Sequence, residues 1–363
     1  MRRSLVTGAT GFIGNRLVRH LIERGDDVTC LARPTSDVSK LQKLRCRIAY
    51  ADLQENHPDV ASAIAACDTV YHLAAATRAV NSSDLIETNL RGIRTVLDSC
   101  ASADTHPTLI YISSIAALGP NADGTPHTES AKCMPVSFYG RSKLACENLA
   151  KKYSNRVPIS IVRPPIVLGQ GDLHGLELFQ IISNIGWHFV PTFSTYDFSV
   201  IHVDDLANAI TLVAEHGNRL ATENSESKNK SSSIETGQGV YNASTDTMTY
   251  SILGRTIGEA LGRKRTRVLR VAKPCLWVVA AINELKGRIF SKPQYLNLDK
   301  YNEGTAGSWA CSSEKLKTET GFAPAYTFVE RLKQTIQWYR HEGLLNSPKQ
   351  QTDSSLQPRQ PAT

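Results

Sequence analysis

The chain opens with a glycine-rich turn set between a short apolar strand and an amphipathic helix. Residues 6–14 read Val-Thr-Gly-Ala-Thr-Gly-Phe-Ile-Gly, and residues 11–24 repeat apolar side chains at helical spacing. Three glycines at this spacing let a backbone turn tightly, approach a pyrophosphate and pack a helix against a strand. The helix N-terminus then offers unpaired N–H groups to phosphates. The pattern predicts a dinucleotide-binding turn, with an ordinary turn as the alternative, and we assign to it Gly8, Thr10, Gly11, Phe12, Ile13 and Gly14.

Short apolar runs and helical patterns alternate through the first 165 residues. Strand-like runs stand at residues 4–7, 27–32, 47–50, 69–73, 109–113 and 159–162. This alternation predicts βαβ crossovers, and hence a parallel sheet covered by helices on both faces. The predicted fold class is α/β: a Rossmann-type, doubly wound parallel sheet with a smaller, mostly helical C-terminal substrate lobe.

The regular alternation ends after Pro164 and Pro165, which suggests a division of the chain. We predict a dinucleotide-binding core over residues 1–168, with 199–217 and 239–246 returning to it, and a substrate lobe over 169–198 and 247–345. Residues 218–238 are rich in Ser, Glu, Asn and Lys, and predict a mobile polar insertion. Residues 346–363 are rich in Gln, Pro and Ser, and predict a disordered tail.

Composition narrows the classes of function. The 41 Lys and Arg residues against 34 Asp and Glu give a net charge of +7, a mild excess from which we predict no nucleic-acid binding. The eight cysteines stand singly, without the spacing of zinc sites, so we expect reduced thiols and no metal site. No signal-peptide pattern follows Arg2 and Arg3, and no run of about 18 apolar residues exists. We therefore expect a cytoplasmic protein without an integral membrane segment.

The end of the second predicted strand bears on the choice of dinucleotide. Enzymes that prefer NAD usually place a carboxylate there for the ribose 2′-hydroxyl, but this chain has Arg33 and no carboxylate before Asp37. The planar guanidinium of Arg33 can pair with a 2′-phosphate. The pattern favours NADP, with NAD as the alternative cofactor and a solvated surface arginine as the alternative role. Asp52 follows the third strand and is assigned to the adenine amino group, with a turn-forming aspartate as the competing interpretation.

A second motif carries the candidate chemistry. Tyr139 and Lys143 are four residues apart in a helical stretch and therefore share one helix face. A tyrosine phenol has a pKa of about 10, and an adjacent ammonium lowers that pKa toward neutral pH, where an acid/base group is most effective. Ser113 and Ser114 end the fifth predicted strand, at the sheet edge where open α/β folds bind ligands. A serine hydroxyl there can polarise a substrate oxygen.

Together these motifs resemble the extended short-chain dehydrogenase/reductase family, over residues 5 to about 345. Residues 7–14 are similar to the cofactor loop, 72–75 to the strand that lines the cofactor, and 139–143 to the active-site motif. Ser114 stands 25 residues before the tyrosine, as the family's catalytic serine usually does. The resemblance implies Tyr139 as acid/base, Ser114 as polariser and Lys143 as helper. The cofactor contacts that it adds are Leu53, Ala74, Ala75, Lys143, Pro165 and Val167.

Residues 30–37 resemble the dihydroflavonol reductase, 3β-hydroxysteroid dehydrogenase and hopanoid-associated epimerase-like branches of that family. Many sugar-nucleotide members carry an asparagine where this chain has Pro164-Pro165-Ile166-Val167. The resemblance implies an NADP-dependent oxidoreductase that transfers a hydride between nicotinamide and a carbonyl or secondary alcohol of a bulky apolar small molecule, such as a steroid, flavonoid or terpenoid. The alternatives are a nucleotide-sugar epimerase or dehydratase with tightly bound NAD, and a redox-sensing module without chemistry.

Two further segments leave alternatives open. Residues 274–290 are strongly apolar, with Lys273 and Lys286 as flanking charges. They fit either a peripheral contact with a membrane surface or a packed helix of the smaller lobe, and the pattern favours the packed helix. Asp204 and Asp205 fit either a metal pair or a helix N-cap, and the N-cap is favoured. The family resemblance also implies a homodimer through helices that include the one carrying Tyr139.

Overall fold

The computed structural model describes residues 1–55, 58–79, 82–121, 123–190, 196–222, 237–290 and 297–346. Within these residues the main sheet has seven strands in the order β10-β6-β5-β4-β1-β2-β3, and every neighbouring pair is parallel. The order reverses between β1 and β4, which is the ligand-binding point of doubly wound sheets. The predicted fold class is confirmed. The strands are β1 (Arg3–Thr7), β2 (Asp27–Ala32), β3 (Arg47–Tyr50), β4 (Thr69–His72), β5 (Thr108–Ile112), β6 (Ile159–Arg163) and β10 (Val240–Asn242).

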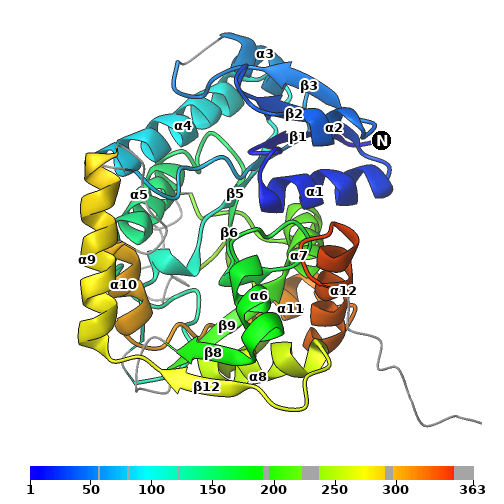
Figure 1. Ribbon diagram of the computed structural model, residues 1–363. Coiled ribbons are helices and arrows are strands. Elements are labelled where there is room, and N and C mark those ends of the chain that lie inside the picture. The colour runs from blue at the N-terminus through cyan, green and yellow to red at the C-terminus, as the bar shows by residue number, and fades with distance from the viewer. Residues whose placement is uncertain are drawn as a thin grey trace, which may run out of the picture.

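Helices cover both faces of this sheet (Figure 1). On one face lie α1 (Phe12–Glu23), α7 (Val203–His216) and α11 (Glu314–Thr320), with α2 (Ser39–Gln42) after β2. On the other lie α3 (Pro58–Ala65), α4 (Ser82–Ser102) and α5 (Phe138–Lys152). Each layer buries its own apolar cluster against the sheet, and burial of such clusters is the main favourable term in folding. Both faces of the sheet are thus buried, so a ligand can reach the sheet only at the ends of its strands.

The remaining elements build a second lobe with its own apolar cluster. Its small sheets join β7 (Ile166–Leu168), β9 (Asp197–His202) and β11 (Asp246–Thr249), and separately β8 (Trp187–Val190) and β12 (Arg267–Arg270). Its helices are α6 (Leu176–Ile185), α8 (Tyr250–Ala260) and α12 (Phe328–His341), with α9 (Lys273–Ile289) and α10 (Leu298–Thr305) packed together at one edge (Figure 1). The strands β7 and β9, which the predicted boundaries assign to the core, pair with each other in this lobe.

The predicted insertion at 218–238 lies outside the described residues from 223 to 236, and the predicted tail lies outside them beyond Asn346. The described start of the insertion, residues 218–222, packs against the core. Leu220 is buried, and its N–H donates to the Ile159 carbonyl at 2.8 Å. The guanidinium of Arg219 donates to Ser160 Oγ at 2.8 Å. Leu220 and Arg219 therefore hold this stretch against β6, although the residues around them in the sequence are mostly polar.

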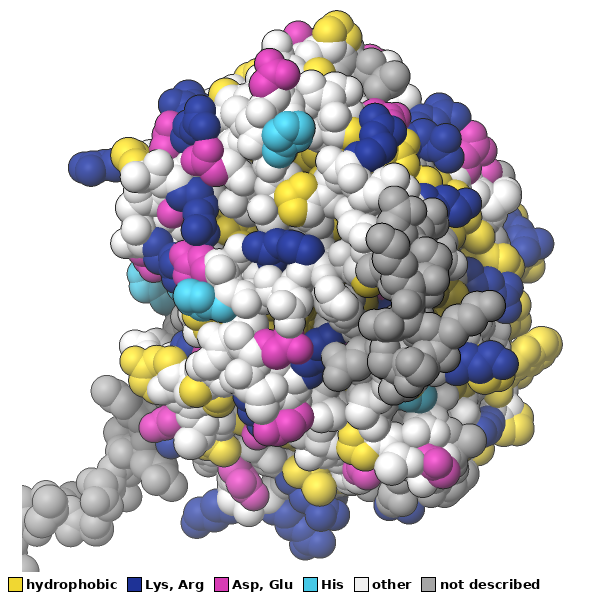
Figure 2. Space-filling view, turned by 180° about the vertical axis from the view of Figure 1, so that it is seen from behind, with side chains coloured by type: hydrophobic (Ala, Val, Ile, Leu, Met, Phe, Trp, Pro, Cys, Tyr) yellow, Lys and Arg dark blue, Asp and Glu magenta, His cyan; other side chains and the backbone are white. Residues whose placement is uncertain are grey.

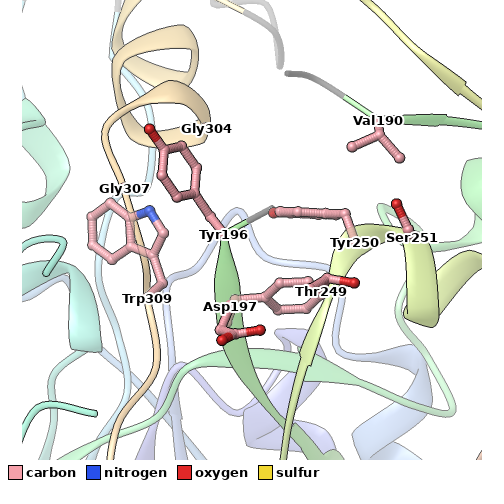
Figure 3. Close-up of a pocket in the computed structure, with 10 residues that line it drawn as sticks. Val190, Tyr196, Asp197, Thr249, Tyr250, Ser251, Gly304, Gly307 and Trp309 are labelled. Carbon is pink, nitrogen blue, oxygen red and sulfur yellow. The ribbon is translucent and has the colours of Figure 1, made fainter. Parts of the chain in front are cut away.

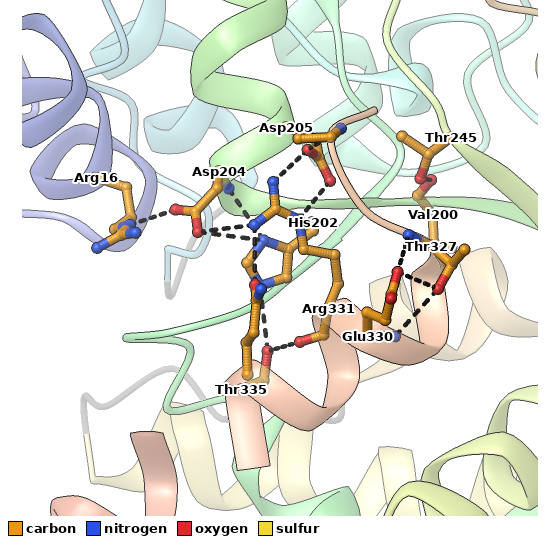
Figure 4. A network of polar contacts seen from close by, with 12 residues as sticks. Arg16, Val200, His202, Asp204, Asp205, Thr245, Thr327, Glu330, Arg331 and Thr335 are labelled. Carbon is orange, nitrogen blue, oxygen red and sulfur yellow. Dashed lines mark hydrogen bonds and ion pairs between the residues drawn. The ribbon is translucent and has the colours of Figure 1, made fainter. Parts of the chain in front are cut away.

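A polar network joins the two lobes (Figure 4). Arg331 of α12 makes two hydrogen bonds to the carboxylate of Asp205, at 2.9 and 2.5 Å, and Arg16 of α1 bonds Asp204 at 2.5 Å. The cap of α7 is His202, whose Nδ1 accepts from the backbone N–H of Asp204 at 3.2 Å. The predicted N-cap role of the two aspartates is therefore wrong: they lie two and three residues after the cap, in the first turn, where carboxylates interact favourably with the helix dipole. Among the described residues, no group of three or more His, Cys, Asp and Glu side chains is placed to hold a metal.

Candidate functional site

The glycine-rich turn is sterically closed to any larger residue at two points. A Cβ on Gly8 would stand 2.8 Å from the backbone nitrogen of Ala74, and the φ of Gly8 is +71°. A Cβ on Gly14 would stand 2.1 Å from the carbonyl oxygen of Gly8. Gly11 closes the turn with an N–H that donates to the same carbonyl at 3.0 Å. The turn thus brings β1, α1 and the end of β4 into contact.

The N-terminus of α1 is open to an anion. Gly11 is the N-cap residue, with no side-chain cap, and no acidic residue stands in the first turn. Unpaired N–H groups and the positive end of the helix dipole therefore face the turn. A cavity of about 450 Å³ lies here, within the size range of small-molecule sites. The residues fit a dinucleotide, because close backbone approach and an open helix end are what a pyrophosphate needs.

Eight of the predicted cofactor residues line this cavity: Gly8, Thr10, Gly11, Arg33, Asp52, Leu53, Ala74 and Ala75. The others that we assigned do not line it: Phe12, Ile13, Gly14, Lys143, Pro165 and Val167. Gly14 serves helix packing, as its contact with Gly8 shows. Pro165 and Val167 follow β6 beside the turn that begins at Ser114, since the neighbouring Pro164 carbonyl accepts from Ile115 N–H at 3.0 Å. The six residues outside the cavity lining therefore lie in α1, in α5 and in the segment after β6.

The two charged candidates of the cavity have distinct surroundings. Arg33 is exposed at its edge, next to Ser36, whose N–H donates to the Arg33 carbonyl at 2.9 Å. Asp52 accepts from the backbone N–H of Gln54 at 2.9 Å, which is the turn-forming role weighed above, and it also lines the cavity. One carboxylate can do both, because it has two oxygens.

Thr7 and Leu73 also line the cavity, and they belong to segments 7–14 and 72–75 that resemble the cofactor segments of the family. The cavity residues that the sequence did not indicate are Leu31, Ala32, Ser36, Ala51, Gln54, Ala76, Thr88, Asn89 and Gly92. Asn89 is the one among them with the most hydrogen bonds to the loop after β4. In the structure it bonds both backbone groups of Ala76, at 2.7 and 2.9 Å, and donates to Ser142 Oγ at 2.6 Å. It thereby ties the loop after β4 to α5. The available sequence signal was an asparagine in the segment that follows residues 72–75.

The helix α5 carries Tyr139 and Lys143 on one face. Ser137 caps its N-terminus, and a Cβ on Gly140 would stand 2.3 Å from the carbonyl oxygen of Ala116. This glycine lets α5 lie directly against the short 3-10 turn Ile115–Ala117, whose N-cap is Ser114. The motif of α5 and the serine at the end of β5 therefore lie at the same strand end.

Lys143 is held in a nearly fully buried position. Its Nζ donates to the carbonyl oxygen of Ile112 at 2.9 Å, and the whole residue is 3% exposed. The Nζ lies 5.9 Å from the ring centroid of Tyr139 and 5.2 Å from that of Tyr111. An ammonium has three donors, so two N–H groups remain for other partners.

The two adjacent serines have different tasks. Ser113 is buried and its hydroxyl donates to Glu147 Oε1 at 2.5 Å. Glu147 is fully buried and also holds the guanidinium of Arg163, at 2.9 and 2.5 Å. Ser114 Oγ instead accepts from Ala116 N–H at 3.2 Å, which leaves its O–H proton available to a substrate oxygen. The geometry therefore separates a structural serine from a candidate catalytic one.

The groups around Lys143 are kept neutral. Burial, with a further contribution from the Lys143 charge, lowers the pKa of His72 to about 3. The Nδ1 of His72 lies 2.8 Å from Thr7 Oγ1, which agrees with an uncharged ring. Burial raises the pKa of Tyr111 well above its usual value. The rings of His72 and Tyr111 are therefore uncharged at neutral pH, beside the buried Lys143.

The smaller lobe also reaches Tyr139, which the sequence analysis missed. Asp299 of α10 accepts from the backbone N–H groups of Phe138 and Tyr139, at 2.8 and 3.4 Å. Burial raises the pKa of this carboxyl above its usual value. Lys300 follows with its Nζ 5.6 Å from the Tyr139 ring centroid. These residues stand 160 positions further along the chain, so no local pattern could have paired them with α5.

A small aromatic gap in the smaller lobe is too tight for a substrate. Figure 3 shows Tyr196, Tyr250 and Trp309 around it, close to Gly304 of α10. Its volume is about 10 Å³, the lower limit for a single water molecule. We therefore do not assign it a ligand.

Comparisons with known proteins agree with this geometry. The family described as "NAD dependent epimerase/dehydratase family" matches residues 4–225. A putative dihydroflavonol 4-reductase of Synechocystis sp. is 30% identical over 223 residues, which are 60% of this chain and 64% of that protein, slightly under two thirds of its length. Sterol demethylase protein B of Methylococcus capsulatus is 23% identical over 94% of this chain and 99% of that protein. Ceramide reductase of Caulobacter vibrioides is 25% identical over 94% and 95%.

Solved structures show the same fold. The crystal structure of gox2253 has a TM-score of 0.74 at 25% identity and covers 95% of this chain and 100% of that one. The dTDP-glucose 4,6-dehydratase of Bacillus anthracis, solved in complex with NAD, has a TM-score of 0.69 at 18% identity and covers 95% and 99%.

Proposed function

The chain belongs to the NAD dependent epimerase/dehydratase family, whose members are NAD(P)-dependent extended short-chain dehydrogenases/reductases, and on this premise we propose that it is an NADP-dependent oxidoreductase. Its reaction interconverts a carbonyl and a secondary alcohol of a bulky, apolar small molecule. The observation that carries the proposal is the strand end where Ser114, Tyr139 and Lys143 meet beside the dinucleotide cavity.

In the direction of reduction, the phenol of Tyr139 gives its proton to the substrate oxygen. Ser114 donates a hydrogen bond to the same oxygen, and the Lys143 ammonium stabilises the tyrosinate that remains. The hydrogen bond of Lys143 to the Ile112 carbonyl fixes its position and leaves two donors for the ribose hydroxyls. The bound nicotinamide supplies the two-electron redox chemistry. The contribution of the protein is mainly positioning and electrostatic support for the developing alkoxide.

Two observations support an apolar substrate rather than a sugar nucleotide. The stretch after β6 reads Pro164-Pro165-Ile166-Val167, which offers no side-chain amide to a diphosphate sugar. Two relatives that match almost the whole chain are named for a sterol and a ceramide, both of which are apolar lipids. We therefore place the substrate among steroid-like, flavonoid-like or terpenoid-like ketones.

The proposal is tested by incubating the purified protein with NADPH and a panel of sterol, flavonoid and terpenoid ketones, and following the absorbance of the reduced cofactor. We expect turnover with at least one of these ketones. Retention of NAD through purification, together with conversion of a UDP- or dTDP-sugar without net redox change, would instead establish the epimerase or dehydratase alternative.

Arg33 allows a test of the cofactor preference alone. The Arg33→Ala variant is expected to lower kcat/KM for NADPH by about 10- to 100-fold, since a charge-assisted contact with the 2′-phosphate contributes about 1.5–3 kcal/mol. The value for NADH should stay nearly constant, because NADH has no such phosphate. Arg45→Ala, at another exposed arginine outside the cavity lining, is the matched control and should change neither value. An equal loss for both cofactors would contradict the assignment.

A further inference from the structure

The helix α9 packs against the protein through its small and polar residues. Leu276, Ala280, Asn283 and Gly287 follow one another at intervals of four, three and four, and therefore share one helix face. Ala280 and Gly287 are the buried residues of the helix. This face lies toward α10, the main neighbour of α9 among the described residues. The interior thus receives little apolar area from a helix that is rich in apolar residues.

The large apolar side chains of α9 point away from the protein. Val278, Ile282, Leu285 and Ile289 form a second stripe at the same spacing, and they are 49%, 49%, 59% and 66% exposed. Trp277 is 51% exposed, beside this stripe. A surface helix ordinarily shows the reverse arrangement, with its apolar stripe toward the core. A continuous exposed apolar patch of this kind marks an interaction site.

Lys and Arg side chains outnumber Asp and Glu in α9 and in the segment before it. From residue 260 to residue 283 the sequence carries no Asp or Glu, and β12 contributes Arg267 and Arg270 to this stretch. Lys273 begins α9 and its Nζ donates to the Thr305 carbonyl of α10 at 3.2 Å. Lys286 and Arg288 stand in the last turns of α9, and Arg288 pairs with Glu284, the acidic residue of the helix, at 3.3 Å. Figure 2 shows hydrophobic and Lys or Arg side chains close together along the edge of the molecule where Figure 1 places α9.

We propose that α9 is a docking helix for a bilayer surface that contains anionic lipids. Its apolar stripe enters the boundary between headgroups and acyl chains, and the flanking lysines and arginines remain at the phosphates. The helix lies in the plane of the interface: no helix in the described part of the chain is long and apolar enough to cross a membrane.

A second copy of this chain fits the same face less well. A twofold interface brings identical patches together, so the cations of both copies would face each other across it. Like charges in apposition oppose association, whereas an anionic lipid surface neutralises them. The charge pattern therefore selects the lipid surface as the occupant.

The docking helix lies close to the candidate active site. It packs on α10, whose Asp299 accepts from the backbone N–H groups at the start of α5, beside Tyr139. A substrate held in the bilayer would thus have a short path to that site. This consequence rests on the proposed function, whereas the binding of lipid by α9 does not, and the two are measured separately.

The test is sedimentation of the full chain with vesicles of phosphatidylcholine alone or mixed with phosphatidylglycerol, in the absence of substrate. We expect binding to the mixed vesicles that weakens with salt. The Ile282→Ser/Leu285→Ser variant should lose binding by about ten-fold or more, because two large apolar side chains no longer enter the interface. Ile252→Ser/Val329→Ser removes two similarly exposed apolar residues from α8 and α12 and is the matched control, which should bind like the parent chain.

Two further measurements complete the test. Lys286→Glu should remove the preference for phosphatidylglycerol, and brominated lipids should quench a fluorescence component that Trp277→Phe abolishes. The proposal is overturned if the parent chain stays in the supernatant with both vesicle types. It is equally overturned if light scattering shows a dimer that Ile282→Ser/Leu285→Ser converts to a monomer, since α9 would then be a protein interface. Turnover of a water-soluble ketone, assayed without vesicles, reports on the proposed function independently of either result.

Discussion

The Tyr139→Phe variant is expected to lose about 100- to 10,000-fold in kcat, the range that a positioned acid/base group contributes. The change removes one oxygen atom and leaves the ring, whose centroid lies 5.9 Å from Lys143 Nζ and 5.6 Å from Lys300 Nζ. The packing of α5 and the dinucleotide cavity should therefore stay intact. Steady-state kinetics with the best ketone and titration of NADPH by fluorescence measure the two effects separately.

The same helix provides a control for this substitution. Tyr153 follows α5 at its C-terminal end, and its hydroxyl donates to Asp98 Oδ1 at 2.6 Å, on the side of α4. Tyr153→Phe deletes a tyrosine oxygen of α5 outside the proposed catalytic group and should keep kcat near that of the parent chain. Full turnover by Tyr139→Phe would remove Tyr139 from the mechanism, and a parallel loss of NADPH affinity would indicate damage to the fold instead.

The features that were predicted from the sequence depend on short-range geometry. A turn with glycines at positions 8, 11 and 14 is specified within nine residues, and the steric contacts of Gly8 and Gly14 confirm why glycine stands there. Tyr139 and Lys143 share a helix face because a helix repeats every 3.6 residues. Such arguments need no knowledge of distant chain segments.

The features that escaped prediction depend on which distant segments meet. The capping of α5 by Asp299 joins residues 160 positions apart. The different roles of Ser113 and Ser114 follow from the position of Glu147, on another element. The apolar pattern of residues 274–290 favoured a packed helix, yet hydrophobicity alone does not tell which face receives a partner. The structure covers the small residues of α9 and exposes the large ones.

The second large effect is expected at Glu147, which is buried beneath the strand end of the proposed catalytic group. Its carboxylate is fully buried, accepts two hydrogen bonds from Arg163 at 2.9 and 2.5 Å and one from Ser113 at 2.5 Å. Removing one partner of a buried pair leaves an uncompensated charge, here a guanidinium that is 2% exposed. Glu147→Ala should therefore lower the free energy of unfolding by about 3–5 kcal/mol, measured by urea denaturation.

Two variants separate the burial of charge from the loss of contacts at this position. Glu87→Ala breaks the exposed pair of Glu87 with Arg91 on α4 and should cost about 0.5 kcal/mol or less, because such pairs are screened by water. Glu147→Leu/Arg163→Met removes both buried charges and should regain most of the stability that Glu147→Ala loses, since apolar side chains of similar volume replace a buried pair at little cost. If the double variant is no more stable than Glu147→Ala, the penalty does not come from the unpaired guanidinium but from the lost packing and from the Ser113 hydroxyl that no longer finds its acceptor.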